Sequence, residues 1–319
     1  MPDLSAVDPE LLPLAEMMPK RSFSAETLAE DRETMMALWR SYERPTDDGI
    51  SREEMLAKGP DGAPDVPVLV YRHEDAPRPT GAVLHIHGGG FVGGAAGNTE
   101  RWNRVEAEVL KCVIISVEYR LAPETRHPGP VEDCYAALCW LHDKAAELGV
   151  DPSRIAVEGV SAGGALAAAT CLLARDRGGP AVAFQSLVYP MLDDREAIKD
   201  PNPNLGNVAW TYQSNRFGWS SLLGEENIGG PDVSPYAAPA RIGNVAGLPP
   251  TFIGTGGLDM LAPENIEYGR RLVEAGVPTD LRVYPRAFHG FDVGTARVGE
   301  EFKADRLAAL GRAIGPEAA

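Results

Sequence analysis

The sequence predicts an α/β fold in which a mainly parallel sheet is covered by helices on both faces. Short apolar runs bounded by glycine and proline recur from residue 66 onward, as buried strands do. Helical stretches separate most of these runs, and strands that alternate with helices build parallel sheets. A serine-centred turn, residues 159–163, stands where one strand gives way to a helix. The length of 319 residues suits one large domain of this class with an insertion.

The individual elements follow from the pattern of apolar residues. The expected strands are residues 68–71, 82–86, 113–117, 155–157, 182–188, 251–254 and 281–284. The expected helices between them are residues 99–110, 132–148, 162–177 and 263–275. Up to about Lys58 the chain reads as amphipathic helix, with Leu28 and Met35 at helical spacing. We therefore expect no strand before the apolar run at residues 68–71.

These elements divide the chain into four segments. Residues 1–65 are expected to form an N-terminal helical cap segment, and residues 66–190 the first part of the catalytic domain. Residues 191–241 are rich in proline, asparagine, glycine and aromatic residues. An inserted cap of short helices explains them better than a structureless loop of that length. Residues 242–319 are expected to be the second part of the catalytic domain.

The composition limits the possible binding partners and the cellular compartment of the protein. The 30 Lys and Arg residues against 46 Asp and Glu residues give 30 − 46 = −16, a charge that repels nucleic acid and anionic membranes. The N-terminus lacks the basic and apolar regions of a signal peptide, and no apolar run is long enough to span a membrane. None of the four cysteines has metal-ligand spacing, so they are expected to be reduced. The sequence thus predicts a cytoplasmic protein without a metal.

The serine turn is the strongest functional signal. Strand 154–157, Gly159, Ser161 and Gly163 match the sharp strand-turn-helix context in which a serine side chain stands clear of the sheet. Glycines two residues to either side are needed because the turn leaves no room for a side chain. The alternative is an ordinary glycine-serine turn, since such strings also occur by chance.

A serine turn of this kind is typical of α/β-hydrolases, in which a catalytic acid and then a histidine follow the serine. Of six histidines only His289 follows Ser161, and it lies just past the strand at 281–284. Asp259 lies past the strand at 251–254 and is the preferred acid. Asp193 and Asp194 follow another strand and are its geometric rivals. Asp280 is expected at the wrong end of its strand, and Glu264 near a helix start, where a carboxylate is favourable for electrostatic reasons alone.

A run of glycines supplies candidate donors for an oxyanion hole. His87-Gly88-Gly89-Gly90 follows the strand at 82–86, and three glycines let the main chain approach a substrate closely. The N–H groups of Gly88, Gly89 and Ala162 are the expected donors. A phosphate-binding loop is the alternative, but no Lys-Ser/Thr follows and the G-x-G-x-x-G spacing is missing. A flexible turn is the other alternative.

Together these features resemble the hormone-sensitive-lipase-like bacterial carboxylesterases of the α/β-hydrolase superfamily. The resemblance runs from about residue 68 to near the C-terminus and rests on six motifs: residues 87–90, 119–124, 158–164, 234–237, Asp259 and 289–291. It implies an α/β-hydrolase fold with a helical cap and cleavage of short-chain carboxylic esters through an acyl-enzyme, with no cofactor. Members often pair through an edge strand, here residues 281–284, so a homodimer is also an expectation.

Aromatic residues near the cap are candidates for substrate contact. These are Phe91, Trp210 and Trp219, together with Trp39 of the N-terminal helix. The alternative for each is that it only packs the cap onto the core. Two other functions stay open for the same fold. One is hydrolysis of amide, carbamate or lactone bonds, and the other is a receptor-like role in small-molecule binding.

Overall fold

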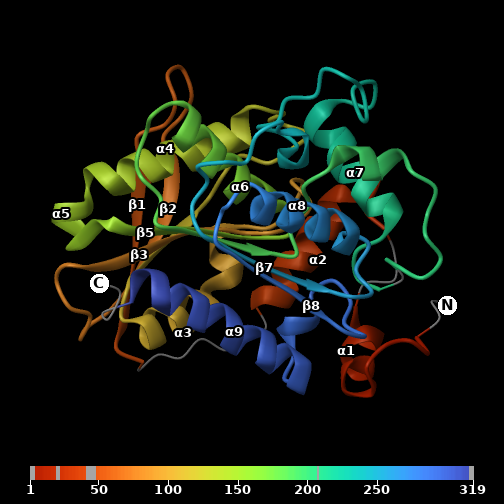
Figure 1. The fold of residues 1–319 in the computed structure, drawn as a ribbon, viewed down its shortest axis with the longest axis horizontal. Helices are drawn as coiled ribbons and strands as arrows, with labels where there is room; N and C mark the ends of the chain where they lie inside the picture. The colour runs from red at the N-terminus through yellow and green to blue at the C-terminus, as the bar shows by residue number, and fades with distance from the viewer. Residues whose placement is uncertain (1–3, 19–21, 41–47, 207, 316–319) are drawn as a thin grey trace.

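An eight-stranded sheet forms the centre of the protein, seen in a computed structural model that describes residues 4–18, 22–40, 48–206 and 208–315 (Figure 1). The strand order is β1-β2-β4-β3-β5-β6-β7-β8. The pairs β1/β2 and β2/β4 are antiparallel, and all other pairs are parallel. The strands are β1 Ile50–Ala57, β2 Val66–His73, β3 Thr80–Ile86, β4 Val113–Val117, β5 Val150–Val160, β6 Phe184–Val188, β7 Thr251–Gly256 and β8 Thr279–Tyr284. The predicted mainly parallel α/β sheet is confirmed.

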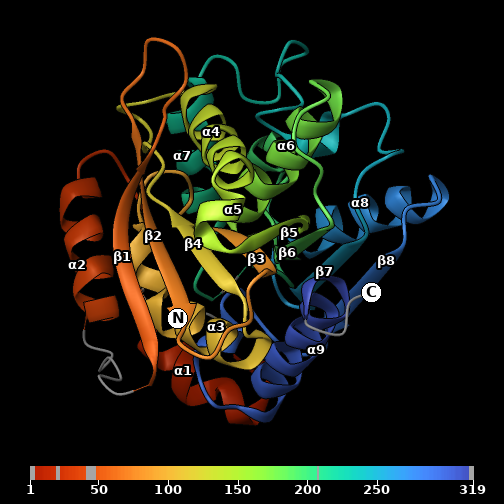
Figure 2. The same ribbon diagram turned by 90° about the vertical axis from the view of Figure 1, so that its left-hand side faces the viewer.

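Helices cover both faces of this sheet (Figures 1 and 2). One layer contains α4 Gly129–Asp143, α5 Ala145–Leu148, α6 Ala162–Asp176 and α8 Ala262–Glu274. The other contains α3 Glu100–Leu110 and α9 Arg297–Ile314. Every residue of β3, β4, β6 and β7 is buried, as expected for strands with a helix layer on each side. Two hydrophobic clusters, one under each layer, form the core.

The N-terminal segment corrects one prediction. The helical reading holds for α1 Leu12–Met17 and α2 Leu28–Arg40, but Ile50–Ala57 is strand β1, not helix. Its Glu, Met, Leu and Ala residues are good helix formers in isolation. Pairing along the whole length of β2 overrides that preference, with Ile50 opposite His73 and Ala57 opposite Val66. Because β1 is an edge strand, most of its side chains remain at least partly exposed and hide the usual apolar signal.

Short helices occupy the long insertion between β6 and β7. They are η3 Asp194–Ile198, α7 Tyr212–Leu223 and η4 Pro239–Arg241, and the remaining short helices of the chain are η1 Pro9–Leu11, η2 Ala96–Thr99 and η5 Phe291–Val293. The N-terminal segment contacts the insertion directly: the Oγ of Ser22 lies 2.7 Å from the Oγ1 of Thr211. Two segments that lie far apart in sequence therefore meet above the sheet.

None of the helices among residues 4–18, 22–40, 48–206 and 208–315 combines the length and the apolar character that a bilayer crossing requires. All four cysteines carry free thiols, with Cys112, Cys134 and Cys171 buried.

Candidate active site

Ser161 occupies a strained turn between β5 and α6. Its backbone has φ 57° and ψ −119°, a conformation that non-glycine residues rarely adopt. A Cβ on Gly159 would overlap the carbonyl of Gly163. One on Gly163 would overlap the carbonyls of Ile86 and His87, at the end of β3. Neither position therefore has room for a side chain, as the sequence predicted, and Gly163 also lets the turn pack against the end of β3.

Ser161, His289 and Asp259 form a hydrogen-bonded chain. The Nε2 of His289 lies 3.0 Å from the Oγ of Ser161, and its Nδ1 lies 2.6 Å from the Oδ2 of Asp259. The other carboxylate oxygen of Asp259 accepts a 2.9 Å bond from the amide of Leu261. With Nδ1–H donated to the carboxylate, Nε2 is left to accept from the serine hydroxyl. Loops after β5, β7 and β8 bring the three side chains together.

The rival acids are bound elsewhere. Asp193 forms a bidentate pair with Arg195, and Asp194 pairs with Arg241. Glu264 accepts a 2.6 Å bond from the amide of Leu192. Asp280 lies at the start of β8 and pairs with Arg282 of the same strand. None of these carboxylates has a hydrogen bond to His289 within the described part of the chain.

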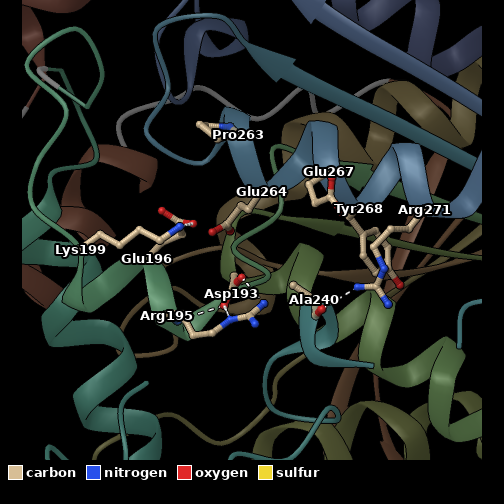
Figure 3. Close-up of a pocket in the computed structure, with 10 residues that line it drawn as sticks. All are labelled: Asp193, Arg195, Glu196, Lys199, Ala240, Pro263, Glu264, Glu267, Tyr268 and Arg271. Carbon is tan, nitrogen blue, oxygen red and sulfur yellow. Dashed lines mark hydrogen bonds and ion pairs between the residues drawn. The ribbon is translucent and has the colours of Figure 1, made fainter. Parts of the chain in front are cut away.

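A polar cavity of about 450 Å³ surrounds Asp193 (Figure 3). Its lining is mostly charged and consists of Asp193, Arg195, Glu196, Lys199, Ala240, Pro263, Glu264, Glu267, Tyr268 and Arg271. Several of these charges are neutralised within the lining, as in the pair between Lys199 and Glu196. Burial raises the pKa of Glu264 well above its ordinary value. Ser161, Asp259 and His289 are not among the lining residues.

The glycine loop after β3 lies against the serine. A Cβ on Gly88 would lie 3.4 Å from the Cβ of Ser161. Gly89 has φ +124°, and the amides of Val92 and Gly93 donate to its carbonyl at 3.1 and 2.9 Å. Ala162 is the first residue of α6, where backbone N–H groups have no partner within the helix. The sequence-predicted donors Gly88 and Ala162 thus both adjoin Ser161.

His87 and Tyr119 support this loop, a role that the sequence did not reveal. Their rings stack at 4.2 Å between centroids, and the Tyr119 hydroxyl donates to the His87 carbonyl at 2.9 Å. Burial lowers the pKa of His87 to about 4, so the ring is neutral at pH 7. Its Nδ1 lies 2.8 Å from the carbonyl of Gly88 and must carry the proton to bond it.

Tyr189 and Asp292 support the histidine from one side. The Tyr189 ring meets the His289 ring edge-on at 4.5 Å, and its hydroxyl donates to the Oδ1 of Asp292 at 2.8 Å. Tyr189 has φ 33°, a strained conformation directly after β6. A tyrosine that ends a strand carries no sequence pattern that could have predicted this contact.

The aromatic candidates divide between the site and the core. The Trp210 ring lies 6.1 Å from the His289 ring, and a Cβ on Gly90 would overlap it. Phe91 and Trp219 are fully buried and pack on each other at 5.1 Å. The side chain of Trp39 lies outside the described residues.

Within the described residues, no three His, Cys, Asp or Glu side chains gather as metal ligands would.

Known proteins share this fold and much of this sequence. A family model for the alpha/beta hydrolase fold matches residues 83–293. Esterase LipI of Mycobacterium tuberculosis (strain ATCC 25618 / H37Rv) is 32% identical over 295 residues, which cover 92% of this chain and 90% of that protein. Carboxylesterase NlhH of the same strain is 36% identical over 274 residues, covering 82% and 83%.

A solved structure of a bacterial heroin esterase is similar over nearly the whole length. The TM-score is 0.92 and the sequence identity 43%, with 97% of this chain and 98% of that chain covered. These matches extend well beyond the serine turn and include the segments that carry the glycine loop, Asp259 and His289. The chain belongs to the α/β-hydrolase family and, within it, to the hormone-sensitive-lipase-like carboxylesterases.

Proposed function

We propose that this carboxylesterase cleaves short-chain carboxylic esters through an acyl-enzyme formed on Ser161. One observation carries the proposal: the imidazole of His289 lies between a serine hydroxyl at 3.0 Å and a buried carboxylate at 2.6 Å. Both distances allow direct proton transfer or hydrogen bonding. The serine is thereby placed next to a base that is held in one orientation.

The reaction would proceed in two halves. The Oγ of Ser161 attacks the ester carbonyl while Nε2 of His289 takes the hydroxyl proton. Collapse of the tetrahedral intermediate expels the alcohol, which receives that proton from the imidazolium. Water then attacks the acyl-enzyme with the same histidine as base, and the carboxylic acid leaves. Asp259 holds the imidazole in one orientation throughout and stabilises the imidazolium.

The developing oxyanion would be bound by backbone amides. We assign this role to the N–H groups of Gly88, Gly89 and Ala162, because Gly88 and Ala162 adjoin Ser161 and the first turn of a helix favours negative charge. Fixed donors in a buried site stabilise the transition state without having to reorganise.

The preference for short acyl chains is supported by Trp210. Its ring lies over Gly90 and beside His289, and its Nε1 donates to the Oδ1 of Asn215 at 3.2 Å. A large ring fixed at this position restricts the space next to the reacting carbonyl. Phe91 and Trp219 would act one layer further back by holding the wall in place, since both are buried.

The test is a series of p-nitrophenyl esters from acetate to palmitate, with wild type and Ser161→Ala compared at equal concentration of folded protein. We expect rapid hydrolysis of the short esters by the wild type and none above background by the variant. Serine-independent turnover would refute the assignment of the nucleophile. No turnover on any ester would favour cleavage of an amide, carbamate or lactone, or a receptor-like binding role.

We also propose that the protein pairs through the open edge of β8, where Val283 is 44% exposed. An unpaired edge strand offers free N–H and C=O groups to a second copy. Light scattering on the purified chain should give twice the monomer mass, and a monomer at micromolar concentration would overturn this. The cytoplasmic location and the four-segment division at residues 65, 190 and 241 remain predictions.

A further inference from the structure

Arg32, in helix α2 of the N-terminal segment, binds three acceptors on the catalytic domain. Its Nε donates to the carbonyl of Val92 at 2.6 Å, and one terminal nitrogen donates to the carbonyl of Ala122 at 3.0 Å. Both terminal nitrogens also bond the carboxylate of Glu124, at 2.7 and 2.8 Å. The planar guanidinium thus joins two separate loops of the catalytic domain to the cap segment.

The first of these loops is the one that carries the oxyanion donors. The amide of Val92 donates to the carbonyl of Gly89, so its peptide units connect Arg32 to the turn at Gly88 and Gly89. The amide of Ala122 donates to the carbonyl of Phe91 at 2.9 Å, which ties the second loop to the first. Arg32 therefore holds both sides of the segment that follows the glycines.

The same N-terminal segment also reaches the aromatic wall of the site. The amide of Phe23 donates to the Oγ of Ser214 at 3.2 Å, and the Phe23 ring lies 6.1 Å from that of Trp210. Met35, one turn along α2 from Arg32, lies against the glycine loop: its Cε would be 3.3 Å from a Cβ on Gly93. A single stretch of chain thus contacts both the wall beside His289 and the loop beside Ser161.

The bonds to carbonyls matter more than the ion pair. Glu124 is 62% exposed on its side chain, and exposed ion pairs contribute little to stability. The Arg32 guanidinium nevertheless lowers the pKa of Glu124 to about 2, so the carboxylate is ionised across the neutral range and orients the arginine. Val92 and Ala122 are fully buried, and a buried carbonyl that loses its donor costs more than an exposed pair.

We propose that Arg32 is a positioning residue for ester hydrolysis. By bonding the Val92 and Ala122 carbonyls, Arg32 fixes the glycine loop and makes the geometry of that loop depend on the docked N-terminal helix. The inference rests on the proposed function of Gly88 and Gly89. Arg32 itself touches neither Ser161 nor His289. Its effect is exerted through the backbone of residues 89–93.

Kinetics separate this role from a role in substrate binding. Arg32→Ala should lower kcat by about tenfold to a hundredfold, less than the loss of an oxyanion donor itself, with KM within about threefold of wild type. The kcat of Arg32→Lys should lie between those of Arg32→Ala and wild type, because an ammonium can bond one of the two carbonyls but cannot hold both. Glu124→Gln keeps the carbonyl bonds and should lower kcat by less than about threefold.

Arg216→Ala is the matched control. Arg216 lies on α7, also pairs with a glutamate, Glu225, and donates to the carbonyl of Ala197, which is outside the glycine loop. An Arg32→Ala variant with the same kcat as Arg216→Ala would overturn the proposal. So would a raised KM with unchanged kcat, since that would identify Arg32 as part of the binding wall.

Hydrogen exchange supplies a readout that does not need turnover. In Arg32→Ala the amides of Val92 and Gly93 should exchange faster than in wild type, because the turn they close onto Gly89 is no longer held. Unchanged exchange would contradict the proposal even if the rate fell. If wild type shows no Ser161-dependent turnover, the proposed function fails, while faster exchange would still show that Arg32 holds the loop. If Arg32→Ala does not fold, Arg32→Lys carries both measurements.

Discussion

Two histidines of this protein each lie next to a buried carboxylate, and each pair forms a group of three side chains with a serine. The order of the hydrogen-bond contacts differs between the two groups. At His289 the imidazole lies in the middle, with Asp259 on Nδ1 and Ser161 on Nε2. At His85 the carboxylate lies in the middle: Glu158 is 3.4 Å from Nδ1 of the histidine and accepts a 2.8 Å bond from Ser186. Only the first order puts an imidazole next to a serine hydroxyl.

Their surroundings differ as well. Glu158 also meets Arg306, which pairs with Glu106 on the α3/α9 side of the sheet. Burial alone would raise the pKa of Glu158, but Arg306 and His85 lower it to about 2. The residue types of a catalytic triad are thus present twice in this fold. The order of contacts, and a serine raised out of the sheet by a strained turn, separate the candidate site from a structural cluster.

The two histidines should differ most in their effect on rate. His289→Gln should lower kcat by about 10⁶-fold, the loss that removal of the catalytic histidine causes in serine proteases. His85→Gln should leave kcat within a few-fold, because its imidazole contacts no reacting group. Initial rates on p-nitrophenyl acetate measure both. A large loss in His85→Gln at full folding would break the distinction between the clusters.

The carboxylates provide the next comparison. Asp259→Asn should cost about 10⁴ in kcat, because the amide would favour the wrong tautomer of His289 while the geometry is kept. Asp193→Asn is the control, since Asp193 bonds Arg195 and was the rival acid by position. The same rates give the answer. If the rate loss appeared in Asp193→Asn instead, the assignment of the acid would be wrong.

The second cluster should matter for stability rather than rate. Arg306→Met leaves the ionised Glu158 buried without its cation and removes the partner of Glu106, and it should lower the free energy of unfolding by about 3–5 kcal/mol. Arg312→Met, on the same helix but 66% exposed, should cost less than about 1 kcal/mol. Urea unfolding measures both variants. Equal effects would show that the buried pairs contribute no more than surface ones.

The last comparison concerns the pH dependence of stability. Burial and the neighbouring Glu158 raise the pKa of Glu106 from its ordinary 4.5 to about 8, so the folded chain retains a proton that the unfolded chain releases. This contribution to stability is complete below pH 4.5 and is lost as the pH rises through 8, with a slope of at most about 1.4 kcal/mol per pH unit. Glu106→Gln should flatten the stability profile over that window, as followed by urea unfolding. Parallel profiles for variant and wild type would contradict it.

The sequence allowed prediction of the elements that have a strong local pattern. The fully buried strands β3 and β4 are mostly apolar, and the turn at Ser161 is confined to a few residues with characteristic glycines. Strand β1 was missed because an edge strand with good helix formers shows no such pattern, and its pairing with β2 is set by tertiary structure. Helix α9 was not assigned either, so the role of Arg306 beneath the sheet could not be predicted.

The serine turn identified Ser161, while chain order and strand ends selected His289 and left Asp259 preferred over its rivals. The structure brings Ser161, Asp259 and His289 into contact, and their catalytic roles remain predictions. The supporting contacts could not be found in this way. Arg32 bonds the carbonyl of Val92, sixty residues away, and a carbonyl acceptor leaves no trace in the side chains of a sequence.

The contact of Gly163 with the end of β3 has a consequence for engineering this protein. At that point the backbone of Gly163 packs directly against the carbonyls of Ile86 and His87. Glycine fits there because it carries only a hydrogen atom where any other residue carries a Cβ. Every substitution of Gly163 adds volume to a contact that is already tightly packed. In the proposed function, variation of substrate range is left to the walls, where Trp210 and the N-terminal segment offer side chains that can be exchanged. The proposed reaction geometry thus depends on a contact that substitution can only disrupt, whereas the proposed substrate wall consists of side chains that can be replaced.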